Sequence, residues 1–352
     1  MRMMRKLYTH NKHLTEAQFL LREFELELTE IDVSNEKALK NSEVILLATA
    51  DPRELKHIIQ GRKEQSVIIF FLGNETYDIP QFEYFNNYQK EIRHCFIYNL
   101  PKKTPYLVSL KCFFAAIYDG GCFHREGTGN IIRHAKNGLD FMRRNRKIRL
   151  DYSASNFPLG YTNTFVSELK NSGYNITGSL LTNKNISEMS KKQRTQIINF
   201  IGAAGSWNRR LALKRMKRVF PNSDFDIKAN GWTNKMLINK DANAFSNNYV
   251  STLLNSKFTL CPPGNLTNQT FRYLESLIMG SLPILPPATI QDNHLWNSWS
   301  EFTKPIYYSW TSNLRKAKNM SEEERLSLVT LALNAEKYRI QNVKNLLHNI
   351  LD

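Results

Sequence analysis

Two side chains of opposite charge stand three residues apart in the stretch FTLCPPGNLTNQTFRYLESLIMGSLPIL at residues 258–285. Arg272 and Glu275 fall within a helix-like pattern, and this spacing places them on one helix face. A guanidinium can bind a diphosphate, and a carboxylate can accept hydrogen bonds from sugar hydroxyls. The pair therefore predicts a binding site for a nucleoside diphosphate sugar.

The elements that would position this pair can be read from the same stretch. An apolar strand at 258–261 runs into a Pro-Pro-Gly turn that ends at Gly264, and a polar loop containing Asn268 follows. A helix then stops at Gly280, before a second apolar strand. The start of such a helix leaves backbone N–H groups unpaired, and these groups and the helix dipole favour a phosphate. Gly264 and Asn268 are therefore predicted to contribute to nucleotide binding.

A second strand-to-helix turn lies upstream, where Gly-Ala-Ala-Gly at 202–205 precedes a basic helix at 209–219. Small residues such as Gly202 let backbone amides approach an anion, although a tight turn needs small residues in any case. Arg209 and Arg210 are cations in the first turn of a helix, where the dipole disfavours them, so a bound anion would explain them. Two such units on one sheet would face a shared crevice at the carboxyl ends of their strands.

An acidic loop at 73–78, GNETYD, follows a buried strand in the N-terminal half. A carboxylate at such a strand end can act as the general base that removes a proton from an acceptor hydroxyl. Glu75 is the first candidate for this base and Asp78 the second, although a loop carboxylate can equally cap a turn. His94 and His124 are the next candidates, but lone histidines are more often structural.

No metal ion or other cofactor is expected. Asp224-Phe-Asp226 has the DxD pattern that holds a divalent metal in one glycosyltransferase class, but it follows a turn, which favours the plain start of a strand. Neither the four cysteines nor the histidines show the spacing of a zinc site, and so few cysteines do not suggest a disulfide framework. The sequence begins without a secretion signal, which predicts a cytoplasmic protein with reduced thiols.

The pattern of apolar runs predicts an α/β fold. Residues 44–50, 67–72 and 94–99 are strand candidates that are apolar throughout and separated by helices, which indicates a parallel sheet covered on both faces. Residues 156–165 look loop-like. The polar stretch 171–192 predicts a linker between an N-terminal domain at 1–170 and a C-terminal domain at 193–352. Apolar positions repeat along 322–351 with helical spacing, so this last helix is expected to dock on the body.

The chain carries a net charge of +16 over 352 residues. Such a charge suits nucleic acid, an anionic membrane surface or an anionic substrate. Basic residues concentrate at 133–149 and 209–218, where a solvated basic face is the simplest interpretation. Nucleic acid is disfavoured because no recognition helix, zinc finger or RNA-binding aromatic signature accompanies these stretches. Peripheral association with the inner face of a membrane would suit an enzyme acting on lipid-linked glycan.

Several segments, in order, resemble the exostosin-like glycosyltransferase family. These segments are FIGAAGSWNRRLAL and FTLCPPG…TFRYLESLIMGSLPIL, while FLGNETYDIPQFEYFNNY and FPLGYTNTF are similar to its ribitol xylosyltransferase branch. The resemblance implies a GT-B fold, with two Rossmann-like domains facing a cleft, and an inverting, metal-independent transfer. It also implies that Glu275 binds the ribose and that Arg272, with Arg209 or Arg210, faces the diphosphate.

The expected reaction moves a sugar from a nucleotide diphosphate donor to a hydroxyl of a cell-surface glycan precursor of the capsule, lipopolysaccharide or teichoic-acid type. No membrane anchor and no second, metal-using domain like those of the animal members of the family are expected, which weighs against their heparan-type substrates. Two alternatives remain open. One is a fucosyltransferase of the same fold, and the other is a non-catalytic protein that binds polyanions or glycans.

Overall fold

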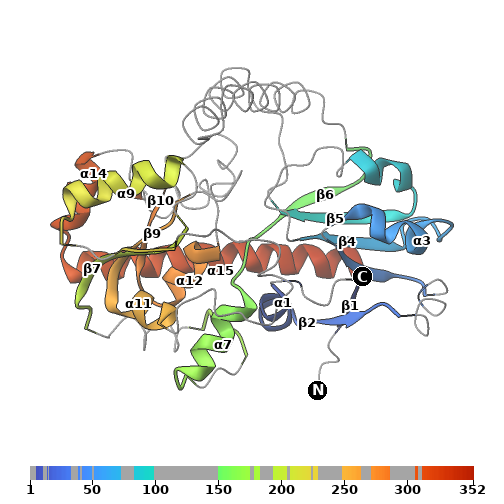
Figure 1. The fold of residues 1–352 in the computed structure, drawn as a ribbon. Helices are drawn as coiled ribbons and strands as arrows, with labels where there is room; N and C mark the ends of the chain where they lie inside the picture. The colour runs from blue at the N-terminus through green and yellow to red at the C-terminus, as the bar shows by residue number, and fades with distance from the viewer. Residues whose placement is uncertain are drawn as a thin grey trace, which may run out of the picture.

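The structure is a computed structural model of the 352-residue chain. It describes residues 5–10, 14, 16–32, 39, 42–49, 51–72, 83–98, 150–174, 178–182, 193–203, 207–222, 225–228, 248–262, 271–285, 306–307 and 311–352. Strands and helices alternate along the chain and build two parallel sheets (Figure 1).

The first unit runs from β1 to α7. Its elements are β1 (Arg5–Thr9), α1 (Ala17–Phe24), β2 (Leu26–Glu30), β3 (Ile45–Thr49), the 3-10 helix η1 (Pro52–Leu55), α3 (Lys56–Ile59), β4 (Val67–Phe71), the 3-10 helix η2 (Phe85–Tyr88), β5 (Ile92–Tyr98), β6 (Ala154–Phe157) and α7 (Asn163–Asn171). The six strands form one parallel sheet in the order β2-β1-β3-β4-β5-β6.

The central strands of this sheet are buried on both faces, as their apolar sequences predict. Every residue of β3 and β4 is buried. Alternate side chains enter different clusters: Ile68 and Phe70 join one core, and Ile69 and Phe71 join the other. Since successive side chains in a strand point to opposite faces, apolar residues at every position require a cover on each side. The α/β class and the parallel sheet are confirmed.

The second unit runs from β7 to α15. Its elements are β7 (Gln196–Ala203), α9 (Trp207–Val219), β8 (Phe225–Lys228), α11 (Tyr249–Asn255), β9 (Ser256–Leu260), α12 (Phe271–Ile278), β10 (Leu282–Leu285), β11 (Ile306–Tyr307), α14 (Thr311–Lys318) and α15 (Glu322–Leu351). The strand order is β11-β10-β9-β7-β8, and each described pairing is parallel.

The second sheet has a topological switch point between β7 and β9. The chain places β8 on one side of β7 and then returns to build β9, β10 and β11 on the other side. In open parallel sheets, ligands bind in the crevice outside the carboxyl ends of the two strands at such a point. The carboxyl ends of β7 and β9, near Gly202 and Cys261, are therefore where this sheet can hold a ligand.

Helix α15 packs along both units, as Figure 1 shows. Ser321 caps its start by accepting a hydrogen bond from the N–H of Glu324. Its buried side includes Val329, Leu333 and Ile340, which belong to the same core cluster as residues from both sheets. The predicted docking of the terminal helix is confirmed. Among the described helices, none is long and apolar enough to cross a membrane.

The first unit leads into α7 through residues 157–162, here named the crossing segment, which passes from β6 toward α7 in Figure 1. All six of its residues are buried. A Cβ at Gly160 would overlap the Phe19 ring, so glycine is needed for this close packing. The loop-like interpretation of 156–165 is thus wrong at both ends, because β6 and α7 enter this range. The domain boundaries at 1–170, 171–192 and 193–352 stay predictions.

Candidate active site

Arg272 lies in the first turn of α12 and reaches the carboxyl end of β7. Its Nη2 donates a 2.6 Å hydrogen bond to the carbonyl oxygen of Ile201, and its guanidinium carbon lies 5.1 Å from the centre of the Phe200 ring. Its Nε is buried, with no hydrogen-bond partner among the described residues. The remaining donors of this half-buried cation lie at the switch point of the second sheet. Guanidinium donors at such an edge can bind an anion.

Gly202 makes this placement of Arg272 possible. Its φ of +150° is a conformation that L side chains rarely adopt. A Cβ built at Gly202 would lie 2.9 Å from Nη2 of Arg272 and 3.4 Å from the Phe200 ring. A side chain at position 202 would therefore compete with the guanidinium for the same space. The structure brings together Gly202 and Arg272, which were predicted from segments 70 residues apart in the sequence.

Glu275 lies one turn after Arg272, but its carboxylate meets groups of the protein. Oε1 accepts hydrogen bonds from the backbone N–H of Thr162, at 2.9 Å, and from its Oγ1 hydroxyl, at 2.8 Å. Oε2 accepts a 2.6 Å hydrogen bond from the hydroxyl of Tyr249. The residue is 1% exposed. A ribose hydroxyl would have to replace one of these donors, so the ribose role of Glu275 stays a prediction.

The environment of Glu275 acts on its charge in two directions. Burial raises the pKa of the carboxyl above its ordinary value, although the hydrogen bonds from Tyr249 and Thr162 and the charge of Arg272 oppose that rise. All three groups that bond the carboxylate can donate, so the bonding pattern is that of an acceptor. Thr162 also caps α7, since its Oγ1 accepts from the N–H of Phe165 at 3.1 Å.

Residues 179–303 match the family model of the RXYLT1 C-terminal domain. The matched part is less than half of the chain and contains β7, α9, β9 and α12. It supports the resemblance to the ribitol xylosyltransferase branch of the exostosin-like family. A comparison with curated proteins finds no match.

The RXYLT1-like region includes all seven predicted nucleotide-binding residues. Gly202, Arg272 and Glu275 are described with their surroundings. Arg209 and Arg210 lie in the first turn of α9, the helix that follows the carboxyl end of β7, as expected, but their side chains are outside the described part. Gly264, Asn268 and the catalytic candidates Glu75 and Asp78 lie outside the described residues. The roles of all these residues stay predictions.

Two partners of Glu275 were missed by sequence reasoning. Thr162 lies before the RXYLT1-like region, and its signal is a threonine immediately before a helix, a common N-cap. Tyr249 is the first residue of α11, and no local pattern distinguishes it. Both residues are recognisable only after the fold brings them to α12.

Two further polar candidates are described in part. The ring nitrogens of His94 lie 2.9 Å from Oγ of Ser153 and 2.8 Å from Oγ of Ser155. Burial lowers the pKa of His94 to about 4. It lies in the first half of β5, away from the carboxyl edge, so its surroundings favour a structural role. Asp226 lies in β8, and Asp224 is outside the described residues. Across the described ranges, no group of three or more His, Cys, Asp or Glu could hold a metal ion.

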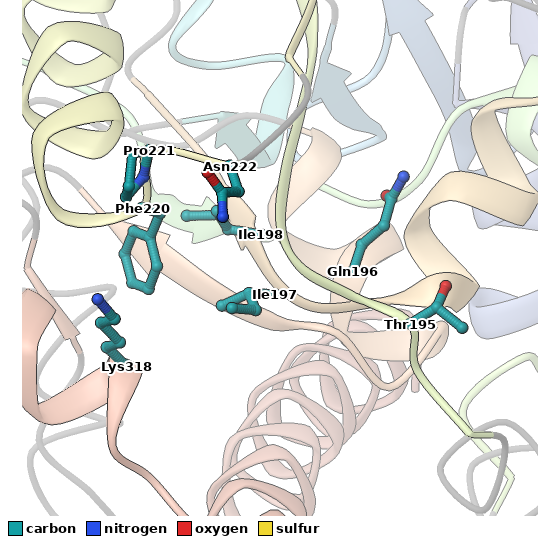
Figure 2. Close-up of a pocket in the computed structure, with 8 residues that line it drawn as sticks. All are labelled: Thr195, Gln196, Ile197, Ile198, Phe220, Pro221, Asn222 and Lys318. Carbon is teal, nitrogen blue, oxygen red and sulfur yellow. The ribbon is translucent and has the colours of Figure 1, made fainter.

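A pocket of about 310 Å³ lies at the amino end of β7, opposite the end that Arg272 reaches. In Figure 2, Phe220 and Lys318 lie on one side of it and the start of β7, including Ile197, on the other. These residues are near the amino end of β7, whereas Gly202 and Arg272 are at its carboxyl end. The pocket is therefore separate from the edge that carries the arginine.

Proposed function

We propose that the chain is a glycosyltransferase of the ribitol xylosyltransferase branch of the exostosin-like family. It transfers a sugar from a nucleoside diphosphate to a hydroxyl of a cell-surface glycan precursor. The observation that carries this proposal is the position of Arg272, whose guanidinium lies at the switch-point edge of the second sheet within the RXYLT1-like region.

In the proposed donor complex, the diphosphate lies outside the carboxyl ends of β7 and β9. Arg272 donates to its oxygens, and Gly202 leaves the space that the guanidinium needs. The backbone N–H groups at the start of α12 and the side chains of Arg209 or Arg210 add positive potential. Gly264 and Asn268 are further candidates for contacts with the nucleotide. These groups replace a metal ion as the source of positive charge.

The proposed chemistry is an inverting displacement. Glu75, or Asp78 in its place, removes the proton from the acceptor hydroxyl. The acceptor oxygen forms a bond to the anomeric carbon, while the bond from that carbon to the phosphate oxygen breaks. The nucleoside diphosphate leaves with the electron pair, and Arg272 stabilises the charge that develops on it. No redox step or covalent enzyme intermediate is involved.

The proposed architecture is GT-B, with the first unit contributing the acceptor side of a cleft and the second unit the donor side. We place the enzyme in the cytoplasm, where lipid-linked glycan precursors at an anionic membrane surface would be its acceptors. Six basic residues in α9 and α14 have exposed side chains that suit such a surface. They are Lys214, Lys217, Arg218, Arg315, Lys316 and Lys318.

Calorimetry with uridine, guanosine and cytidine diphosphates tests the donor site. At least one should bind, and Arg272→Ala should weaken that binding by about tenfold or more, because a charge-assisted hydrogen bond contributes roughly 1.5–3 kcal/mol. Arg53→Ala is the matched control, since Arg53 forms an exposed ion pair with Asp51 in the first unit. Equal affinity in wild type and Arg272→Ala would contradict the proposed donor site. Transfer from a fucose donor would favour the fucosyltransferase alternative.

The exposed cations of α9 and α14 support a second candidate, a protein that binds polyanions without catalysis. The affinity of such a protein for an acidic polysaccharide would fall steeply as the salt concentration rises, and the protein would not bind nucleotides. Nucleotide-independent binding of an acidic polysaccharide, together with no hydrolysis or transfer from any donor, would favour this candidate over the enzyme.

A further inference from the structure

Glu275 is bonded to two elements that lie far from it in the sequence. Thr162 is 113 residues away and ends the crossing segment, and Tyr249 is 26 residues away and begins α11. Thr162 is 3% exposed and Tyr249 is 1% exposed. One carboxylate thus joins α12 to the start of α7 and to the start of α11. Anions are favoured at the amino ends of helices, which is where both partners lie.

Other contacts hold different parts of α12. The hydroxyl of Tyr273 donates to Glu336 of α15 at 3.0 Å. After the helix ends, Arg194 donates to the carbonyl oxygen of Met279 at 2.6 Å, and Arg325 donates to that of Gly280. Glu275 ties α12 to the crossing segment, one turn from the arginine that reaches β7. A shift of this turn would move Arg272 with it.

We propose that Glu275 is a positioning residue that holds Arg272 at the carboxyl edge of β7 through its bonds to Thr162 and Tyr249. The inference rests on the proposed function, because it takes the diphosphate as the ligand of Arg272. This role differs from a contact with ribose, because the carboxylate accepts its hydrogen bonds from protein groups. It also links the donor site to the first unit, because Thr162 continues directly from β6 and the crossing segment.

The first test compares uridine, guanosine and cytidine diphosphates with inorganic pyrophosphate, which has no ribose. Glu275→Leu should weaken pyrophosphate and the nucleotide that binds wild type by the same factor, about fivefold to tenfold. Glu23→Leu is the matched control, because Glu23 is also buried and also accepts three hydrogen bonds, but it lies in α1. It should leave both affinities unchanged in the folded protein.

The second test repeats the pyrophosphate titration with Arg272→Ala and with the double variant Arg272→Ala/Glu275→Leu. If Glu275 acts through Arg272, the double variant should bind pyrophosphate with the same affinity as Arg272→Ala alone. A loss confined to the nucleotide would overturn the inference in favour of a ribose contact. A loss that persists without Arg272 would overturn it in favour of an effect independent of the arginine.

Circular dichroism establishes that each variant is folded under the titration conditions. If Glu275→Leu does not fold, Glu275→Met replaces it under the same criteria, because its unbranched side chain is similar in length and its thioether is only a weak acceptor. If wild type binds the diphosphate and the Glu275 variants retain full affinity, the inference alone fails. If wild type binds neither nucleotide nor pyrophosphate, the proposed function fails and the inference fails with it.

Discussion

Two buried carboxylates, Glu23 and Glu275, accept hydrogen bonds from neighbouring residues of the crossing segment. Their surroundings differ, and the difference distinguishes a purely structural carboxylate from one that we propose also supports a binding site. Glu23 of α1 accepts from the hydroxyl of Tyr161 at 2.9 Å, and Glu275 of α12 accepts from Thr162. Glu23 also accepts from Oγ of Ser179 and from the N–H of Leu180. Each carboxylate therefore has three protein donors, and each ties the segment to a different unit.

The difference between the two regions is what lies one turn away along the helix. Glu275 follows Arg272, which reaches the edge of the second sheet beside Gly202. Glu23 lies one turn after Phe19, a buried core residue. The arginine next to it, Arg22, donates to Gln18 of its own helix and to the carbonyl oxygen of Gly178. The same device of a buried, fully bonded carboxylate thus stabilises one region and, by our proposal, also positions a ligand-binding cation in the other.

The largest expected effect is on stability, and it should be common to both regions. Glu23→Leu and Glu275→Leu should each lower the free energy of unfolding by roughly 3 kcal/mol, because buried donors lose their acceptor and each unpaired group costs about 1–3 kcal/mol. Urea denaturation followed by circular dichroism measures this. A large loss for one variant and none for the other would break the comparison, because the two carboxylates would not then be equivalent in the fold.

A titratable group in the first sheet offers an effect of similar size. The pKa of His94 is lowered from 6.5 to about 4 by burial. Between these values the unfolded state binds more protons, so the free energy of unfolding should rise with pH from about 4 to 6.5 and then level off. The full span amounts to about 3 kcal/mol. His94→Gln should flatten this part of the pH profile of urea denaturation.

Glu275 should have the opposite effect of pH on the free energy of unfolding, which distinguishes the second sheet from the first. Its folded-state pKa lies above the ordinary 4.5, so its contribution to stability falls as pH rises from 4.5 through the folded value. The difference in unfolding free energy between wild type and Glu275→Gln should therefore decrease over that window. If His94→Gln and Glu275→Gln changed the pH dependence of the free energy of unfolding in the same direction, the burial assigned to His94 or to Glu275 would be wrong.

The sequence predicted the central strands well because they are buried on both faces. Residues 44–50 and 67–72 correspond to β3 and β4, and the basic and terminal helices were also located. The edge strands of the first sheet were missed. β2 is Leu26–Glu30, with mostly exposed or half-buried residues, and β6 has a buried residue only at its end. Edge strands need little apolar surface, so an apolar run does not mark them.

The site was predictable where topology alone brings residues together. Gly202 and Arg272 were both assigned to strand-to-helix units, and the carboxyl ends of parallel strands share one edge. The partners of Glu275 were not predictable, because they depend on how the crossing segment packs between α1 and α12. Helical spacing places Arg272 and Glu275 on one face, but it cannot tell which of the two reaches the edge of β7 and which reaches the crossing segment.

The smallest expected effect gives the finest test of the comparison. Tyr161→Phe and Tyr249→Phe each remove one hydroxyl donor, from Glu23 and from Glu275 respectively. Each should cost about 1 kcal/mol of unfolding free energy, the usual contribution of one hydrogen bond. Only Tyr249→Phe should also weaken pyrophosphate binding, by about twofold to threefold. Glu275 then loses one of its hydrogen bonds, and the turn that carries Arg272 is held less firmly. An equal loss of pyrophosphate affinity in Tyr161→Phe would mean that the crossing segment as a whole, rather than Glu275, transmits the effect to the donor site.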